Sequence, residues 1–580
     1  MVEVVFDIEA DGLLEGASKI HMCCAKVLET GETKTFKTAE GLQEYFDKAD
    51  KIIGHNIVAY DLPMLSKFWD IHVKMSKVYD TLIMSRLENS SRANHSLREW
   101  GKTLECYKGD CEDFSEATES MEKYCQQDVE VTCKVYQYLK ERLKSVPTLT
   151  QQIEHFSQLI LEKQRQHGFL LDTQKLLDTK SELDKEYLEL FKKLQELCPP
   201  RQVILDEYVP RFKKDGELTA NSKRIIESDE CIKKGDKYFK VEYRTFNIDS
   251  PQEIVERLAG VWKPVEFTNH GQPKVSEANL ETIPDDAPEA FRTIKQCKIC
   301  KSRSTLLQAY LDSTWNGDSR AHGQVFSIGT KTHRMSHKNP NMANIPSEKS
   351  YKGDECREMF TVPEGYKLIG CDAAGIQLRA LAHYVNDPVL ISEITSGDIH
   401  TYLAEKVYHL TGKDARSRGK TITYAILMGA GVAKIASLAG TDYKGGKEIM
   451  KSIADMIHGW DAFQKHIALR AKIGYFNAID GSHIPLAFAH YGMSAYLQSF
   501  EQALMKFAMV STYKEIQKRG LTAQQVCCVH DELQYEVLEK DTEEVKQILL
   551  DSFRKSGEWY HSRCPIVGEC KVGNNWSETH

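Results

Sequence analysis

Two groups of acidic residues, far apart in the chain, have the spacing expected of metal-binding carboxylates. In the first group, Asp7 and Glu9 end an apolar run and are two positions apart, so on a strand both side chains face the same way. Asp61 is followed closely by a proline that suits a first helical turn, which places this carboxylate at a helix N-terminus. Tyr124 and Asp128 are four positions apart and would share one face of a helix.

This first group indicates a site for divalent cations. Carboxylates held together repel one another, and the repulsion is tolerable when cations lie between them. Oxygen ligands without soft partners favour Mg²⁺ or Mn²⁺, and two such ions can hold the attacking and leaving oxygens of a phosphodiester hydrolysis. A lone Asp-x-Glu is more often a surface pair, so the prediction depends on all three segments occurring in this order.

The second group consists of Asp372 and Asp531. Asp372 ends a short apolar strand that runs into a helix, and Asp531 would lie at the tip of a turn between two short strands within residues 526–537. Two aspartates from different elements, about 160 positions apart, are what a second two-metal site would need.

A row of four side chains lies between these two aspartates. Arg416, Lys420, Tyr424 and Met428 repeat every four residues and would form one row on a helix. Two cations followed by an aromatic side chain could grip a triphosphate and then cover the sugar and base. Taken in isolation, the same pattern also fits an amphipathic helix with a solvated basic end.

Composition limits the broad class of the protein. The length of 580 residues suggests about four structural units, and 41% hydrophobic residues can form several cores. We expect no membrane segment and no secretory signal, because the chain has no long apolar run and no basic region before its first strand. The net charge of −8 does not exclude nucleic-acid binding, since basic residues can gather in a groove. The sixteen scattered cysteines predict a reduced protein without a disulfide framework.

The elements that must position these groups follow an α/β pattern with several domains. Residues 1–143 alternate strand-like and helix-like segments, and a linker follows. Helical patterns cover about 152–198 and 286–315, and the Pro- and Gly-punctuated segment 199–245 between them is predicted to be an irregular insertion. From about 320 to the end, strands and helices alternate again.

The first acidic group resembles the DEDD exonuclease superfamily, in its tyrosine-containing subclass. The likeness covers about residues 1–143 and implies a ribonuclease H-like 3′→5′ proofreading exonuclease. It implies that Asp7, Glu9, Asp61 and Asp128 bind metal and that Tyr124 orients the attacking water. Segments beginning at Asp80 and His95 also look like parts of phage proofreading domains, with a structural role.

The second group and the basic row resemble motifs A, C and B of family A DNA polymerases, especially the replicative enzymes of short-tailed, T-seven-type phages. Further segments support this likeness: Gly397–Thr401, Thr332–Arg334, Asn339–Pro346, Leu497–Ser499 and Gly573–Trp576. The resemblance implies a right-hand polymerase domain after the exonuclease. Its expected parts are a thumb at 150–315, a palm at 316–395 and 487–580, and fingers at 396–486.

The resemblance also implies residue roles in DNA synthesis from dNTPs on a primer–template. Asp372, Asp531 and the Ala373 carbonyl would hold two Mg²⁺ ions, with Mn²⁺ as a substitute, and Glu532 would lie nearby as a further catalytic carboxylate. The incoming dNTP would contact His400, Arg416, Lys420, Tyr424, Gln377 and Met428. The DNA would contact Arg334, Gln498 and His530.

Three positions depart from the family pattern. The family usually has Glu at the position of Gln377 and Tyr at that of Met428, as hydrogen-bonded neighbours, so we interpret these two residues as a compensated pair. The family Glu also excludes ribonucleotides, and the similar shape of Gln predicts that this exclusion survives. Tyr424 implies weak discrimination against dideoxynucleotides. His333 replaces a usual Gly, without an evident consequence.

The resemblance implies a role in phage replication in the cytoplasm of an infected bacterium, beside a helicase–primase. It leaves open whether a thioredoxin-like processivity factor binds 199–245. Three other classes of protein would fit parts of this pattern: a nuclease with a non-catalytic DNA-binding module, a single-subunit RNA polymerase, and a structural DNA clamp. The intact polymerase aspartates and basic row disfavour the first, a bulky Gln377 with a proofreading domain disfavours the second, and two carboxylate clusters disfavour the third.

Overall fold

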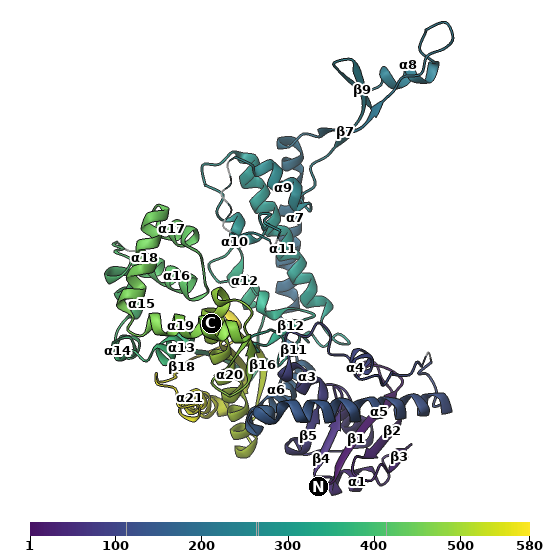
Figure 1. The fold of residues 1–580 in the computed structure, drawn as a ribbon, viewed down its shortest axis with the longest axis vertical. Coiled ribbons are helices and arrows are strands. Elements are labelled where there is room, and N and C mark those ends of the chain that lie inside the picture. Colours follow the sequence, from purple (N-terminus) through teal and green to yellow (C-terminus); the bar gives the residue numbers. More distant parts are fainter. Residues whose placement is uncertain (112, 261, 263, 265, 269, 413) are drawn as a thin grey trace. The chain divides into compact units, whose positions relative to one another are not determined.

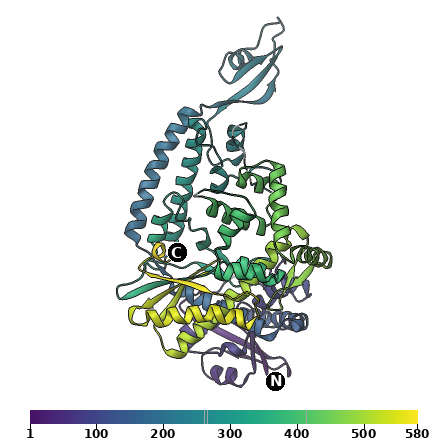
Figure 2. The same cartoon turned by 90° about the vertical axis from the view of Figure 1, so that its left-hand side faces the viewer.

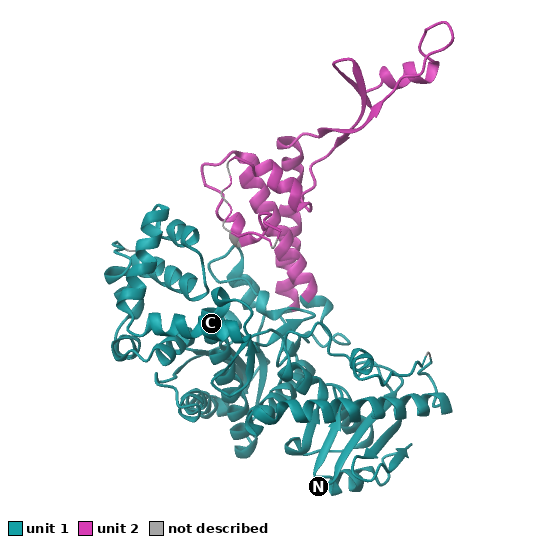
Figure 3. Ribbon diagram, viewed as in Figure 1, with its two compact units in different colours: residues 1–172, 310–580 teal, residues 173–309 magenta. Residues whose placement is uncertain are grey.

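The computed structural model describes residues 1–580 except 112, 261, 263, 265, 269 and 413. The chain divides into two compact units, residues 1–172 with 310–580 and residues 173–309 (Figure 3). Each unit has its own hydrophobic core, and strands and helices occur in both. Among the described residues, no helix combines the length and the apolar character needed to cross a bilayer.

A five-stranded mixed sheet forms the N-terminal part of the first unit, with strand order β3-β2-β1-β4-β5. The strands are β1 (Glu3–Ala10), β2 (Ile20–Val27), β3 (Thr33–Phe36), β4 (Lys51–Gly54) and β5 (Val78–Asp80). β1 pairs antiparallel with β2 and parallel with β4, so it is the central strand. Apolar side chains of β1 enter cores on both faces of the sheet, which explains its almost continuous apolar run.

Helices cover both faces of this sheet. The longest, α5 (Glu119–Arg142), lies along β1 and β2 (Figure 1). The others are α1 (Leu42–Lys48), α2 (Asp61–Trp69), α3 (Thr81–Glu88) and α4 (Leu97–Thr103). After α5 the chain passes through a 3₁₀ turn at Leu143–Ser145 into α6 (Thr148–His167), which also packs against the second sheet.

The second sheet of this unit has four antiparallel strands in the order β16-β17-β13-β18. Its strands are β13 (Tyr366–Ala373), β16 (Ala523–Val529), β17 (Glu532–Leu538) and β18 (Gly568–Gly573). The helix α21 (Thr542–Trp559, yellow in Figure 2) packs against β13, β17 and β18. α20 (Gly492–Arg519) is buried over most of its length and packs against α6, α13 and α21.

Between β13 and α20 the chain is mainly helical. The helices are α13 (Ile376–Val385), α14 (Pro388–Ser396), α15 (Ile399–Lys406), α16 (Ala415–Leu427), α17 (Val432–Ala439), α18 (Tyr443–Met456) and α19 (Trp460–Ile473). Short strand pairs and helices complete the unit: β6 (Phe169–Leu170) with β10 (Arg320–Ala321), β11 (Gln324–Phe326) with β12 (Ser336–Lys338), β14 (Tyr475–Asn477) with β15 (His483–Pro485), α12 (Gly353–Glu358) and α22 (Trp576–Thr579).

The second unit contains long helices and a small sheet. Its helices are α7 (Thr173–Leu197), α8 (Ala220–Ile226), α9 (Pro251–Leu258), α10 (Glu277–Leu280) and α11, which begins at Glu289 and ends at Asp312 in the first unit. Cys297 and Cys300 are buried residues of α11.

The prediction of an irregular insertion at 199–245 was wrong. This segment contains a three-stranded antiparallel sheet of β7 (Arg201–Tyr208), β9 (Lys237–Arg244) and β8 (Cys231–Lys234), in that order. Gly235 has a φ of 61° and belongs to a two-residue turn that joins β8 to β9. Such a glycine connects two strands of a hairpin, although in the sequence it looked like an interruption.

The expectation that all cysteines are reduced was also wrong at one pair. β13 and β18 place Cys371 directly opposite Cys570, with 4.1 Å between their Cα atoms, and the two form a disulfide. Within the part of the chain that the structure describes, the fourteen other cysteines form no disulfide. Because these two cysteines are 199 positions apart, no local pattern could have revealed the pair.

Candidate active sites: two carboxylate clusters

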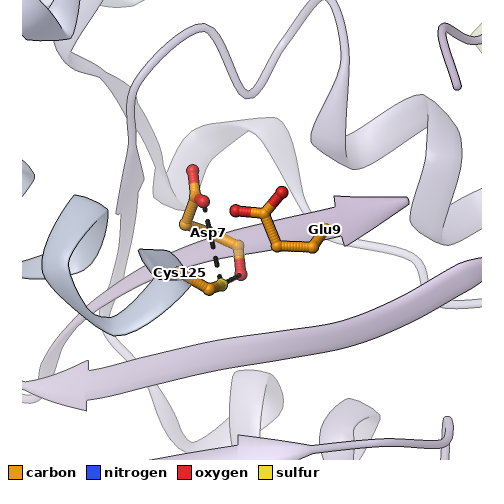
Figure 4. Close-up of side chains that lie close together, drawn as sticks. All are labelled: Asp7, Glu9 and Cys125. Atoms are coloured by element: carbon orange, nitrogen blue, oxygen red, sulfur yellow. Dashed lines mark hydrogen bonds between the residues drawn. The ribbon is translucent and has the colours of Figure 1, made fainter. Parts of the chain in front are cut away.

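The first cluster is centred on β1. Asp7 and Glu9 project from the same side of this strand, as the two-residue spacing predicted (Figure 4). One carboxylate oxygen of each lies within 4.8 Å of the other and of the Cys125 sulfur, which comes from α5. The Cys125 thiol donates a hydrogen bond to the Asp7 carbonyl oxygen at 3.4 Å, so α5 is anchored directly to the strand that carries both acids.

Asp61 and Asp128 reach the same place from two helices. Asp61 is the first residue of α2, and its carboxylate accepts a hydrogen bond at 3.2 Å from the backbone N–H of Ile8, the residue between the two acids of β1. Asp128 is a buried residue of α5, one turn after Tyr124. Charge repulsion from Asp61 and Asp128 acts on both Asp7 and Glu9, so the four carboxylates form one cluster.

This cluster holds more negative charge than its surroundings can stabilise. Burial raises the pKa of Asp7 well above its ordinary value, and repulsion from Asp61 adds to the effect. Burial also raises the pKa of Glu9 to about 8 and that of Asp61 to about 7. Among the described residues, Asp128 Oδ1 is buried without a hydrogen-bond partner. An unpaired buried carboxylate oxygen beside three further acids fits a site for hard divalent cations.

Lys108 belongs to this site, although no sequence pattern pointed to it. It lies between α4 and α5, forms an ion pair with Asp128, and places its ammonium 4.8 Å from the centre of the Tyr124 ring. Its charge opposes the burial effect on Asp128 and Glu9. The residue lies outside any regular element, so neither helical nor strand periodicity could have pointed to it.

Asp80, from one of the segments predicted to be structural, supports the cluster through the backbone. Its carboxylate accepts hydrogen bonds from the N–H groups of Asn56, Val58 and Leu82 at 2.8 to 3.0 Å. It therefore caps α3 and fixes the loop that leads into Asp61.

The second cluster lies where β13 and β17 meet. Asp372, near the end of β13, pairs with Glu532, the first residue of β17, and the Ala373 N–H donates to the Asp531 carbonyl oxygen at 2.9 Å. Asp531 occupies the turn between β16 and β17, as predicted, next to His530 with a φ of 55°. Two aspartates 159 positions apart are thus brought side by side by one antiparallel strand pair.

These two aspartates repel each other strongly. Burial raises the pKa of Asp372 to about 6, with repulsion from Glu532 as the next cause, and the positive charge of Lys420 opposes the shift. Burial raises the pKa of Asp531 well above its ordinary value, and repulsion from Asp372 adds to this. Like the first cluster, this pair is chemically suited to bind divalent cations.

Glu532, predicted as a third carboxylate of this cluster, makes its hydrogen bonds elsewhere. Its oxygens accept hydrogen bonds from the indole N–H of Trp576 and pair with His580 Nδ1, both at 2.9 Å. Burial tends to raise the pKa of Glu532, but hydrogen bonds from His580, Gln534 and Trp576, together with the charge of His580, lower this pKa by more, so it lies below its ordinary value. Glu532 therefore links the cluster to the C-terminal helix α22.

The predicted basic row lies on α16, and His400 lies on the neighbouring α15. Arg416, Lys420 and Tyr424 lie on α16, whereas Met428 is the residue that ends this helix. Arg416 Nε donates to the carboxylate of Asp398 at 2.6 Å, and Asp398 also caps α15, which carries His400. The His400 and Tyr424 rings are 5.9 Å apart. A cavity of about 310 Å³ between α13, α15 and α16 is lined by Gly375, His400 and Arg416, among others.

Gln377 and Met428, which we interpreted as a compensated pair, contact different residues. Gln377 donates its amide hydrogen to Glu501 Oε2 at 3.0 Å. Met428 lies at the exposed end of α16, and its sulfur is contacted at 3.8 Å by the amide of Gln498. Glu501 also pairs with Arg334 at 2.5 Å. Glu501, which was not predicted from the sequence, therefore connects the two predicted residues Gln377 and Arg334.

The backbone conformation at His333 shows why a glycine is usual at this position. Its φ of 61° lies in the left-handed region, where glycine is favoured. A side chain at this position is strained, which accounts for the glycine usual in the resembling polymerases. Gln498, also predicted to contact DNA, accepts a hydrogen bond at 3.0 Å from Thr332, immediately before His333.

Comparisons with known proteins agree with this arrangement. The chain is 26% identical to the DNA-directed DNA polymerase of Escherichia phage T7, over 100% of both proteins. It is 25% identical to DNA polymerase I of Aquifex aeolicus, over 91% of this chain and 88% of that protein. The solved POL domain of Pol1 from M. smegmatis, a complex with DNA primer-template and dNTP, shares the fold, with a TM-score of 0.79 and 17% identity over 100% of this chain and 96% of that one.

The family is shown by the sequence itself. A family model described as DNA polymerase family A matches residues 217–578, more than half of the chain and the part that contains Asp372, the α16 row and Asp531. The mixed α/β fold class predicted from the sequence is confirmed as well. The chain is a DNA-directed DNA polymerase and belongs to DNA polymerase family A.

Proposed function

We propose that this polymerase extends a primer by two-metal nucleotidyl transfer at Asp372 and Asp531, and that it proofreads by 3′→5′ hydrolysis at Asp7, Glu9, Asp61 and Asp128. The observation that carries the proposal is the presence of two separate clusters of buried acids, on two different sheets, whose pKa values are raised by burial and repulsion. A single cluster would support one phosphoryl-transfer reaction, and two clusters support two.

Divalent cations fit both clusters. The unpaired Oδ1 of Asp128 and the all-oxygen donor sets favour Mg²⁺, with Mn²⁺ as a substitute. Asp372, Asp531 and the Ala373 carbonyl would hold two ions in one site, and the four exonuclease carboxylates would hold two in the other. Such ions, when bound, neutralise developing charge on the phosphate and lower the pKa of the attacking hydroxyl or water.

The chain's own residues supply binding and orientation. In the polymerase site, Arg416, Lys420 and His400 bind the triphosphate, and Tyr424 and Gln377 border the sugar. Arg334, Gln498 and His530 contact the primer–template near the primer end. In the exonuclease site, Tyr124 orients the attacking water. Catalysis in both sites is then mainly positioning and charge neutralisation.

We also propose the domain assignment made from the sequence. Residues 1–143 form the exonuclease, 150–315 the thumb, 316–395 with 487–580 the palm, and 396–486 the fingers. The compact unit Thr173–Ala309 supports a separate thumb, and the four-stranded sheet with Asp372 and Asp531 supports a palm. The biological setting that we propose is phage replication in the cytoplasm of an infected bacterium, beside a helicase–primase.

A primer-extension assay with Mg²⁺ tests both activities. A 5′-labelled primer on a longer template is incubated with and without dNTPs, using the unchanged chain, Asp7→Ala/Glu9→Ala and Asp531→Ala. We expect the unchanged chain to extend with dNTPs and to degrade without them. The first variant should only extend, and the second should only degrade. Extension without degradation by the unchanged chain would refute the exonuclease proposal and leave the polymerase proposal standing.

A further inference from the structure

A buried carboxylate, Glu501, connects two residues that we propose to lie in the polymerase site, Arg334 and Gln377. It belongs to α20, and only 1% of its surface is exposed. One oxygen pairs with the Arg334 guanidinium at 2.5 Å, and the other accepts the Gln377 amide hydrogen at 3.0 Å. Its negative charge also acts on Asp531 and on the phenol of Tyr424, so it faces the reacting centre.

The chemistry of this triad explains why residue 377 is an amide. An ionised carboxylate can only accept hydrogen bonds, and a buried one is costly unless donors satisfy it. Gln377 can donate to Glu501, whereas a glutamate at the same position would place a second carboxylate 3.0 Å from the first. The glutamine therefore fits the presence of Glu501 on α20, which is its hydrogen-bond partner.

The hydrogen bond between Gln377 and Glu501 also fixes the orientation of the Gln377 amide. Because the nitrogen of Gln377 faces Glu501, the amide cannot rotate without breaking a charge-assisted hydrogen bond. Arg334 in turn prevents Glu501 from turning away, since it holds the other oxygen. The side chain at the sugar edge of the dNTP is thus locked by two residues from other elements.

We propose that Glu501 is a specificity-determining residue that positions Gln377 and so sets the discrimination between deoxyribonucleotides and ribonucleotides. This inference rests on the proposed function, in which Gln377 borders the sugar of the incoming nucleotide. Glu501 acts through Gln377 and need not touch the nucleotide itself.

The test compares kcat/KM for one dNTP and the matching rNTP on a defined primer–template. All variants are made in the full chain with Asp7→Ala/Glu9→Ala, so that proofreading does not remove the ribonucleotide. They are Glu501→Ala, Gln377→Glu, and the double variant Gln377→Glu/Glu501→Gln, which exchanges the amide and the carboxylate. Thermal melting is measured for each variant.

We expect Glu501→Ala to lower the ratio of kcat/KM for the dNTP to kcat/KM for the rNTP about tenfold, because one charge-assisted hydrogen bond is lost. Gln377→Glu should lower kcat/KM for the dNTP by at least about tenfold, since two buried carboxylates then face each other. The double variant should have a dNTP-to-rNTP ratio of kcat/KM, and a kcat/KM for the dNTP, within about threefold of those of the starting enzyme. The reason is that its amide again donates to its carboxylate.

Glu515→Gln is the matched control. Glu515 lies on the same helix, pairs with Arg519 at 3.2 Å, and is distant in sequence from the triad, so this variant should leave the ratio unchanged.

Two results would overturn the inference: an unchanged ratio in Glu501→Ala, or no recovery in the double variant relative to Gln377→Glu. The second result decides the matter even where Glu501→Ala fails to fold. Failure of the proposed function looks different. A starting enzyme that uses both nucleotides equally would show that Gln377 does not guard the sugar, before any variant at position 501 is compared.

Discussion

At the scale of single residues, the acids around β1 link cation binding to pH. The raised pKa values mean that part of this cluster is protonated near neutral pH when no cation is bound: Glu9 has a pKa of about 8 and Asp61 of about 7, with Asp7 shifted in the same direction. A cation must then displace protons, so its affinity should increase as the pH rises.

The raised pKa values also predict how the stability of the metal-free chain changes with pH. A carboxyl group with a raised folded-state pKa stabilises the fold below its unfolded-state pKa of about 4, and this contribution is lost as the pH rises through the folded-state value. We expect the melting temperature of the metal-free chain to fall between pH 4 and about pH 8. The increase in melting temperature on adding Mg²⁺ should be larger at pH 8 than at pH 6.

Differential scanning fluorimetry across this pH range checks the prediction. Asp7→Ala/Glu9→Ala is the control, because it removes two of the repelling groups and should flatten the pH dependence. A Mg²⁺ effect that decreases with pH in the unchanged chain would contradict the proton displacement that we expect.

Lys108 allows a second prediction at this scale. Its ammonium already occupies one oxygen of Asp128, so it competes with a cation for this ligand and repels it. Lys108→Met should therefore lower the Mg²⁺ concentration needed for half-maximal 3′→5′ hydrolysis, roughly fivefold if the interaction amounts to about 1 kcal/mol. A Mg²⁺ titration of primer degradation measures this, with Lys102→Met on the exposed face of α4 as control. A higher Mg²⁺ requirement would show instead that Lys108 organises the ligands.

At the scale of elements, α6 and α20 are joined by a buried ion pair. Lys506 and Glu154 are both almost fully buried, their charged atoms are 2.5 Å apart, and Lys506 also donates to the His333 carbonyl oxygen at 3.1 Å. Removing one partner leaves the other as an uncompensated buried charge, which typically costs about 3–5 kcal/mol. Lys506→Met should thus destabilise this unit and disturb the segment before Arg334.

Replacing both partners should be much less harmful. Lys506→Met/Glu154→Leu leaves no unpaired charge, and apolar replacement of a buried pair is often close to neutral. We expect the double variant to have a higher apparent melting temperature and a higher urea midpoint than Lys506→Met, as measured by heating and by unfolding in urea. A double variant less stable than either single variant would mean that the pair does more than compensate its own charges.

The elements also show how far the sequence alone could lead. The strand with Asp7 and Glu9, the helix with Tyr124 and Asp128, and the hairpin around Asp531 were predictable, because each depends on spacing within a few residues. Lys108 was not, since it lies outside any regular element, and Glu501 was not, since it reaches its site from a helix far along the chain. The partner of Gln377 lies 124 positions away, and no periodicity reports such a contact.

At the scale of the whole molecule, the small sheet of β7, β8 and β9 belongs to a different compact unit from both clusters. It belongs to the second unit, whereas every residue proposed to act on DNA or nucleotide belongs to the first. Its ends meet, because Arg201 and Arg244 are directly paired across β7 and β9. The intervening residues can therefore be removed and the two ends joined by a two-residue turn such as Asn-Gly.

Replacing residues 202–243 by Asn-Gly should change the rate of single-nucleotide insertion and of primer degradation by less than about twofold, since the removed residues include none that we propose to contact nucleotide, DNA or metal. Rapid-quench measurements of one insertion and of degradation check this against the unchanged chain. Because each reaction is followed within one binding event, the result separates chemistry from the length of product made per encounter with DNA. Retained chemistry with shorter products would assign this sheet to holding DNA or an accessory factor, whereas lost chemistry would show that the sheet supports the catalytic unit.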